Sequence, residues 1–200
     1  VLQGYKKTVF FVLLLSVLLF VLRDFWGMYT ERLTEMIGQG LIDRYIVARY
    51  ISLIGAILLG VIYFLFYYYI VTYIISLITD IPFKRIQKVQ IYVIPTLLLF
   101  NFLEFIIFST IQFVPLYSPF SVAAIVAQFT PNLWVLYFFN QIACSTVITI
   151  MIHYTFLAQW IDEGRKSLLI KLIAVQIFLA AMVATFSTSP FIEWIERGLS

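Results

Sequence analysis

Long apolar runs constrain this chain more than any other feature of its sequence. Five runs are suited to crossing a bilayer as helices, and they cover about residues 8–22, 46–78, 89–114, 133–157 and 168–188. Hydrophobic residues make up 63% of the 200 positions and charged residues only 12%, a balance that no water-exposed surface can carry. The sequence therefore predicts an all-α fold, a polytopic membrane protein whose single transmembrane domain, residues 1–200, is a bundle of five transmembrane helices.

Three segments add detail to this pattern. The run at 46–78 would make a helix about 50 Å long, whereas a hydrocarbon core is about 30 Å thick, so this span must tilt, kink or project from the bilayer. The first loop, residues 23–44, carries apolar residues at helical spacing among its charges, which predicts an interfacial helix on the outer membrane surface. The charge-free segment 120–129 is too short to span, and we expect it to dip into the membrane or cap the bundle.

The distribution of Lys and Arg predicts the orientation of the chain. With a cytoplasmic N-terminus, eight basic residues lie inside: Lys6, Lys7, Lys84, Arg85, Lys88, Arg165, Lys166 and Lys171. The other five then lie outside, where acidic residues outnumber them. The positive-inside rule favours this arrangement, which predicts a multi-pass protein of the cell membrane with its N-terminus in the cytoplasm and its C-terminus outside. A formal net charge of +3 is too small for a nucleic-acid binder.

Four polar residues are candidates for a layer inside the membrane. Glu104 lies near the middle of the third predicted span, where a charge costs about 2.5 to 3.5 kcal/mol on insertion scales, so its side chain should face the bundle interior. Asn101 lies on the same helix face, and Asn140 and Gln141 are expected at a similar depth on the antiparallel fourth span. One interpretation is a neutral carboxyl that hydrogen-bonds Asn140 or Gln141 and holds the helices together. The alternative is a binding or transport site for a proton, an ion or a small molecule.

Two sets of residues are candidates for contact with a partner. Small residues recur at every fourth position of the last span, at Ala180, Ala184 and Thr188, which is typical of close helix packing. The cytoplasmic turns offer basic side chains to anionic headgroups or to a cytosolic protein, namely Lys84, Arg85, Lys88, Arg165 and Lys166. In a simpler interpretation, the small residues pack the last helix into its own bundle and the basic residues only set topology. The expected partners are the lipid bilayer and either a transporter-like membrane protein or a second copy of the chain.

The sequence contains no motif for catalysis. It lacks the G-x-S-x-G and H-E-x-x-H patterns, a P-loop and a paired acidic motif that could hold Mg²⁺. Because Cys144 and His153 are the single cysteine and histidine, neither an intrachain disulfide nor a zinc site can form, and no cofactor or metal is expected. The spans also lack the chain of ionisable groups that ion-coupled transporters usually carry. We expect a non-enzymatic protein, with a transport protein and a lipid-modifying enzyme with an unfamiliar site as the alternatives.

The order of features after the second span resembles bacterial members of the Yip family, five-span membrane proteins named for their interaction with Ypt/Rab GTPases. Phe83, a basic cluster, Tyr92 and then Pro95 at the start of a spanning helix are similar to the beginning of that family's third helix. A charged turn at 162–166 that leads into a last apolar helix is similar to its final hairpin. The likeness covers about residues 46–188 in layout.

The chain also departs from this family. Eukaryotic relatives carry a Tyr-Gly-Pro element before their first span, and the nearest string here, residues 116–120, falls between the third and fourth spans. The resemblance implies a membrane adaptor without enzymatic activity, linked to Rab-dependent trafficking in eukaryotes and in bacteria sometimes to an ABC-type exporter. We therefore expect an adaptor or accessory subunit that assists such an exporter or membrane trafficking.

Overall fold

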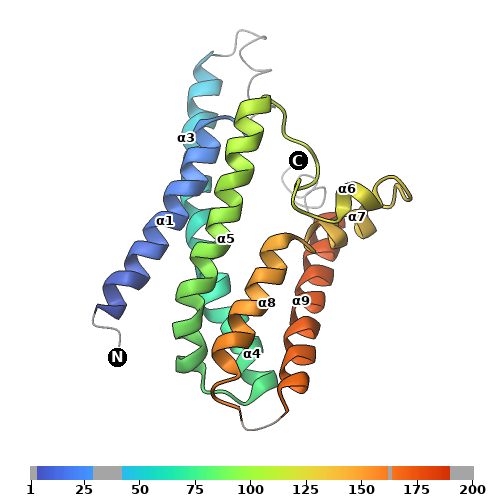
Figure 1. Ribbon diagram of the computed structural model, residues 1–200. Coiled ribbons are helices and arrows are strands. Elements are labelled where there is room, and N and C mark those ends of the chain that lie inside the picture. Colours follow the sequence, from blue (N-terminus) through green and yellow to red (C-terminus); the bar gives the residue numbers. More distant parts are fainter. Residues whose placement is uncertain (1–3, 29–41, 162–163, 190–200) are drawn as a thin grey trace. The chain divides into compact units, whose positions relative to one another are not determined.

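The computed structural model describes residues 4–28, 42–161 and 164–189, and most of them are helical (Figure 1). Among these residues, β-structure is limited to one isolated bridge between Ser121 and Ala143. The apolar residues on which the predicted interfacial helix depends fall within 29–41, so that prediction lies outside the described residues. The described part of the chain confirms the all-helical fold class.

The helices follow one another along the chain with short connections. Their order is α1 (Tyr5–Phe25), α3 (Ile42–Leu65), the π-helical turn η1 (Phe66–Val71), α4 (Thr72–Thr79), α5 (Phe83–Ile111), α6 (Ala123–Val126), α7 (Leu133–Asn140), α8 (Cys144–Leu157) and α9 (Arg165–Thr188). The segment α3–η1–α4 forms one helical stretch of 38 residues, which confirms the long second run. A π-turn inside a helix is frequently found at functional sites and is one recognised cause of a helix kink.

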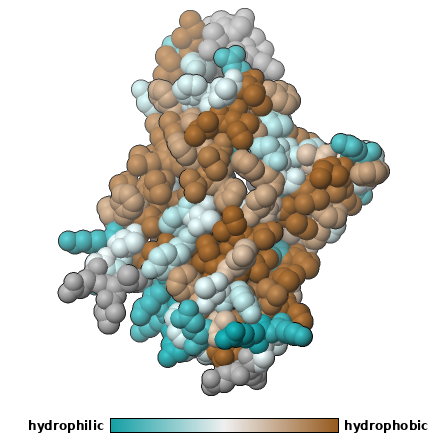
Figure 2. Space-filling view, viewed as in Figure 1, coloured by the Kyte–Doolittle hydropathy of each residue, from teal (hydrophilic) through white to brown (hydrophobic). Residues whose placement is uncertain are grey.

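Four of the described segments are long and apolar enough to cross a membrane. They are Tyr5–Phe25, Ile42–Thr79, Phe83–Ile111 and Arg165–Thr188, and between 17% and 39% of the residues in their most apolar windows are buried. The remaining side chains are largely apolar and exposed, and Figure 2 shows hydrophobic residues over much of the visible face. An apolar surface of this extent is suited to contact with lipid. These helices indicate a multi-pass membrane protein.

The fourth predicted span, 133–157, is not one continuous helix. It consists of α7 and α8, which are separated by residues 141–143. The charge-free segment supplies hydrogen-bond partners at this break, because the Val122 N–H donates to the Ile142 carbonyl and the Cys144 N–H donates to the Phe120 carbonyl, both at 3.1 Å. Irregular backbone at membrane depth is tolerated where other protein groups satisfy it. The prediction of five continuous spans is therefore not confirmed, since α8 has only 14 residues.

The described residues divide into two compact units. The first unit comprises Val1–Ser76 and Pro82–Val114 and therefore holds α1, α3, η1 and α5; the second comprises Leu77–Ile81 and Pro115–Ser200 and holds α7, α8 and α9. In the first unit, α1 packs against both α3 and α5 (Figure 1). An apolar cluster joins these helices and η1, and its buried members are Val12, Leu19, Phe64, Tyr68, Ile94 and Leu98.

A glycine allows the close approach of α1 and α3. A Cβ atom on Gly60 would lie 2.7 Å from the Cα of Val17 and 3.2 Å from the Ser16 carbonyl oxygen. The buried Ser16 hydroxyl donates to the Gly60 carbonyl across the same contact, at 2.8 Å. The absence of a side chain at residue 60 therefore sets the distance between these two helices.

The α1 helix is longer at its C-terminal end than the apolar run predicts. Gly27 has a φ of +90°, its N–H donates to the Asp24 carbonyl, and the Met28 N–H donates to the Arg23 carbonyl. This pattern is a Schellman motif, in which glycine provides the left-handed residue that ends a helix. Because the helix ends only there, Arg23 and Asp24 belong to α1. The sequence had predicted them to lie in the following loop, so that prediction is wrong.

Candidate functional site

The most polar arrangement in the first unit lies where the C-terminal end of α1 meets α3 and α5. We call it the polar clamp, and its members are Arg23, Asp24, Arg49, Ser52, Tyr63 and Asn101. Arg23 and Asp24 are only 8% and 4% exposed, so two charged side chains are buried next to each other at the end of one helix. Such residues are expensive to bury in a membrane protein and are therefore functional or structural anchors.

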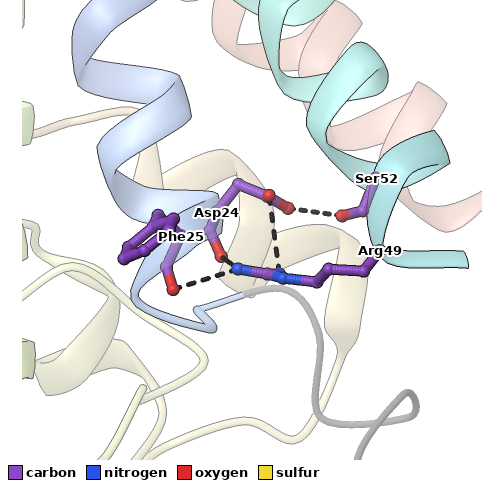
Figure 3. A network of polar contacts seen from close by, with 4 residues as sticks. All are labelled: Asp24, Phe25, Arg49 and Ser52. Atoms are coloured by element: carbon purple, nitrogen blue, oxygen red, sulfur yellow. Dashed lines mark hydrogen bonds and ion pairs between the residues drawn. The ribbon is translucent and has the colours of Figure 1, made fainter. Parts of the chain in front are cut away.

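Asp24 joins α1 to α3 (Figure 3). Its carboxylate accepts a hydrogen bond from the Ser52 hydroxyl and forms an ion pair with Arg49, in which Nη1 and Oδ2 lie 3.5 Å apart. The Nη2 atom of Arg49 donates to the Asp24 carbonyl at 2.8 Å and to the Phe25 carbonyl at 3.0 Å. The last carbonyls of a helix lack intrahelical donors and carry partial negative charge. Arg49 of α3 therefore caps the C-terminus of α1 and neutralises Asp24 at the same time.

Arg23 joins α1 to α5. Its Nη1 donates to the Asn101 Oδ1 at 3.1 Å. The Asn101 Nδ2 in turn donates to the Tyr63 hydroxyl at 3.3 Å and to the Leu97 carbonyl at 3.0 Å. Asn101 thus links all three helices, because Arg23 belongs to α1 and Tyr63 to α3. A polar network that joins three helices in this way fixes their arrangement in a low-dielectric environment.

The four residues of the predicted polar layer belong to different units. Asn101 and the half-buried Glu104 lie one turn apart on α5 in the first unit, as their spacing predicts. Asn140 and Gln141 lie in the second unit, at the end of α7 and at the helix break. The Asn140 Oδ1 accepts a hydrogen bond from the Ser118 N–H at 2.8 Å and so supports the loop. Contact between the two pairs stays a prediction.

The predicted basic contact residues are all exposed. Lys84, Arg85 and Lys88 occupy the first two turns of α5, and Arg165 and Lys166 are the first two residues of α9. Neither helix has an acidic residue in its first turn.

The small-residue stripe on α9 is covered over most of its length. Ala180 is 4% exposed and Ala184 is fully buried, whereas Thr188 is exposed. Nearby, the Trp134 indole N–H of α7 donates to the Thr185 hydroxyl of α9 at 3.1 Å. The two alanines therefore pack within the chain, and Thr188 is the member of the stripe that a partner can reach.

The positions that carry the family resemblance lie on α5. Phe83 is the first residue of the helix, and Tyr92 is exposed. Pro95 lies inside the helix and not at its start, because α5 begins six residues before the predicted span. Proline has no N–H and therefore removes one hydrogen bond of the helix. The hydroxyl of the neighbouring Thr96 donates to the Tyr92 carbonyl at 2.8 Å.

In the part of the chain that the structure describes, no group of three or more His, Cys, Asp or Glu side chains could hold a metal ion. His153 is almost fully buried on α8, and its Nδ1 lies 3.0 Å from the Thr149 carbonyl oxygen. This contact lies within one turn of the histidine's own helix.

Five clamp residues were not among the candidates predicted from the sequence: Arg23, Asp24, Arg49, Ser52 and Tyr63. Arg23 and Asp24 were expected in the first outer loop because the first apolar run stops at residue 22, and Arg49 was counted only among the outside charges. Gly27 was the available signal, since a glycine five residues after an apolar run is typical of a helix that continues to that point. No comparable signal marks Ser52 as the partner of Asp24.

Comparison of the chain with protein-family models, with curated proteins and with solved structures finds no match.

Proposed function

We propose that this chain is a non-enzymatic membrane adaptor or accessory subunit, which acts by contact with another membrane protein. The observation that carries the proposal is the use of the intramembrane polar groups. Arg23, Asp24 and Asn101 are bonded to neighbouring helices, and this use of polar side chains is that of a scaffold. The exposed surfaces that remain are apolar helix faces and basic turns, which suit lipid and protein partners.

The proposal includes the orientation and the family. A cytoplasmic N-terminus in the cell membrane places the exposed starts of α5 and α9 on the cytoplasmic side. The likeness to bacterial Yip proteins at Phe83, Tyr92 and Pro95 supports a role beside an ABC-type exporter or in membrane trafficking. Thr188 and the basic residues Arg165 and Lys166 are the contact residues on α9.

Copurification from native membranes tests this proposal. The tagged full-length chain is extracted in mild detergent, and the recovered proteins are quantified for the wild type and for Arg165→Gln/Lys166→Gln. Lys171→Gln is the matched control, because this half-buried lysine lies on the same helix about one turn further in. We expect the double variant to lose a membrane-protein partner that the control retains. Recovery of the same proteins by all three chains, in the same amounts, would contradict the contact role of this turn.

A second candidate function, binding or transport of an ion or small molecule, is favoured by one observation. Arg23 and Asp24 are buried, Arg23 bonds Asn101, and Glu104 follows one turn later on α5, so ionisable groups gather at this level of the first unit. Intramembrane ionisable residues often mark transport pathways. Reconstitution of the purified chain alone in vesicles distinguishes the two functions, because solute flux that depends on Glu104 is expected only of a transporter.

A further inference from the structure

The first unit carries a concentration of positive charge at one end. Lys6 and Lys7 lie in the first turn of α1, and Lys84, Arg85 and Lys88 lie in the first two turns of α5. All five side chains are exposed. We call these five residues the basic rim.

Helix register places these two groups of charges at the same level. Arg23 of α1 bonds Asn101 of α5, which lies 78 residues later in the sequence. The rings of Trp26 and Phe105 meet edge to face at 6.1 Å, and these two residues are separated by almost the same number of positions. The two helices therefore run parallel in a fixed register. Lys6 precedes Arg23 by as many residues as Lys84 precedes Asn101, so the starts of both helices lie at the end of the unit away from the polar clamp (Figure 1).

The stability of the helices does not explain this placement. Helix N-termini carry partial positive charge, so a cation there is unfavourable by about 0.3 to 1 kcal/mol. Neither α1 nor α5 has an acidic residue in its first turn that would offset this charge. An external anion would offset the unfavourable charges of Lys6, Lys7, Lys84 and Lys88 at these helix starts. Clusters of four to eight Lys and Arg beside a membrane-spanning helix are typical of surfaces that bind anionic lipids.

We propose that the basic rim, Lys6, Lys7, Lys84, Arg85 and Lys88, binds the headgroups of anionic phospholipids. This inference rests on the proposed function, because it names a lipid partner for basic turns that are otherwise assigned to headgroups or to a protein. Charge complementarity selects the lipid: the rim is cationic, and apolar exposed side chains such as Phe10 and Leu14 continue along α1 directly behind it. A phospholipid matches both features, since its phosphate meets the rim and its acyl chains meet the helices.

Binding of a defined lipid to the purified chain tests the proposal. The full-length protein in neutral detergent is titrated with phosphatidylglycerol, and with phosphatidylcholine as the uncharged reference. The two readouts are the number of lipids retained in native mass spectrometry and the shift in Tm. The variant Lys84→Gln/Lys88→Gln removes two charges from one helix face, and Arg44→Gln, which removes an exposed charge from the start of α3, is the control.

We expect tighter binding of phosphatidylglycerol than of phosphatidylcholine, and weaker binding at higher salt. Each rim charge should contribute about fivefold in affinity, so the rim variant should lose at least tenfold while the Arg44→Gln control changes little. Equal retention of both lipids, or equal loss in both variants, would overturn the proposal. If the rim variant fails to fold, Lys6→Gln/Lys7→Gln at the start of α1 is the second test, with the same expected loss.

The copurification experiment distinguishes failure of this inference from failure of the proposed function. Loss of lipid selectivity with unchanged recovery of a protein partner would leave the adaptor in place and contradict the lipid surface alone. Binding of an acidic protein at the rim, abolished by Lys84→Gln/Lys88→Gln while phosphatidylglycerol retention stays unchanged, would replace the lipid by a protein.

Discussion

Gly60 is the residue at which the packing of the first unit is most sensitive to substitution. A methyl group there would lie 2.7 Å from a backbone atom of α1, so the two helices must move apart. We expect Gly60→Ala to lower the free energy of unfolding by about 1 to 3 kcal/mol, as in other overpacked contacts. Gly55→Ala is the matched control on the same helix, because a methyl group at residue 55 meets nothing within 4 Å. Unfolding in detergent measures both; equal stability of the two variants would contradict the close contact.

The ion pair of Asp24 and Arg49 leads to a second prediction at the residue scale, about the stability of variants that remove one of its charges. Asp24→Asn removes the charge from a buried site but can keep the bond to Ser52, whereas Arg49→Gln removes the donor to the last carbonyls of α1. Each substitution should lower the free energy of unfolding by about 1 to 3 kcal/mol, less than a fully buried pair because Arg49 is 26% exposed. The double variant should lose less than the two single losses together. Strict additivity in this double-mutant cycle would show that the residues do not interact.

Single residues of the clamp were only partly predictable. Asn101 was selected because it lies on the same helix face as Glu104, and its side chain bonds Arg23, Tyr63 and the Leu97 carbonyl. Arg23 and Asp24 were missed because charge was taken to mark the end of a span, whereas a charged residue at a helix end can be buried when another helix supplies its partner. The partner of Asp24 lies 25 residues away and that of Arg23 lies 78 residues away, and no local pattern reveals either.

At the scale of elements, the helix break between α7 and α8 leads to a prediction about its hydrogen bonds. Asn140 accepts from the Ser118 N–H, so Asn140→Leu should leave that donor without its acceptor and lower the free energy of unfolding by about 1 to 3 kcal/mol. Gln141→Leu is the control, because Gln141 bonds Thr146 through its backbone carbonyl, which the substitution retains. The two variants are compared by thermal unfolding in the same detergent. Greater loss in Gln141→Leu than in Asn140→Leu would show that the side chain of residue 140 does not hold the loop.

The apolar runs predicted most helices of this chain, but they did not predict the helix break that backbone hydrogen bonds produce. The first, second, third and last runs correspond to α1, α3–η1–α4, α5 and α9. The fourth run has neither proline nor glycine at residues 141–143, so nothing local predicts a break there. The break depends on donors and acceptors from residues 120–122, and a pattern of hydrophobicity cannot report such bonds. Pro82, by contrast, was a usable signal for the early start of α5, because it is the N-cap of that helix.

At the scale of the whole molecule, topology is the first quantity to measure. In a Cys144→Ser background, single cysteines at Ser118 and Gly198 should react with an impermeant thiol reagent from outside, and one at Gly164 should not. The reason is the excess of basic residues on the predicted cytoplasmic side. Labelling at residue 164 alone would reverse the orientation. Labelling at residues 118 and 164 from the same side would show that α7 and α8 do not cross the membrane.

The division of the helices into two units was not predicted, although Pro82, Pro115 and Pro119 lie at or next to its boundaries. The predicted polar layer depends on that arrangement. Its two halves lie in different units, so spacing along the chain predicted the pair on α5 correctly but could not establish a contact with Asn140 or Gln141.

The central claim is that intramembrane polar groups hold this protein together and do not carry out chemistry. Glu104 tests it most directly. Glu104→Gln should keep both Tm and the recovery of native partners, because an amide can still hydrogen-bond, whereas Glu104→Leu should lower the free energy of unfolding by about 0.6 to 2 kcal/mol. A Glu104→Gln variant that is as stable as the wild type but loses its partners or a measured solute flux would contradict the claim.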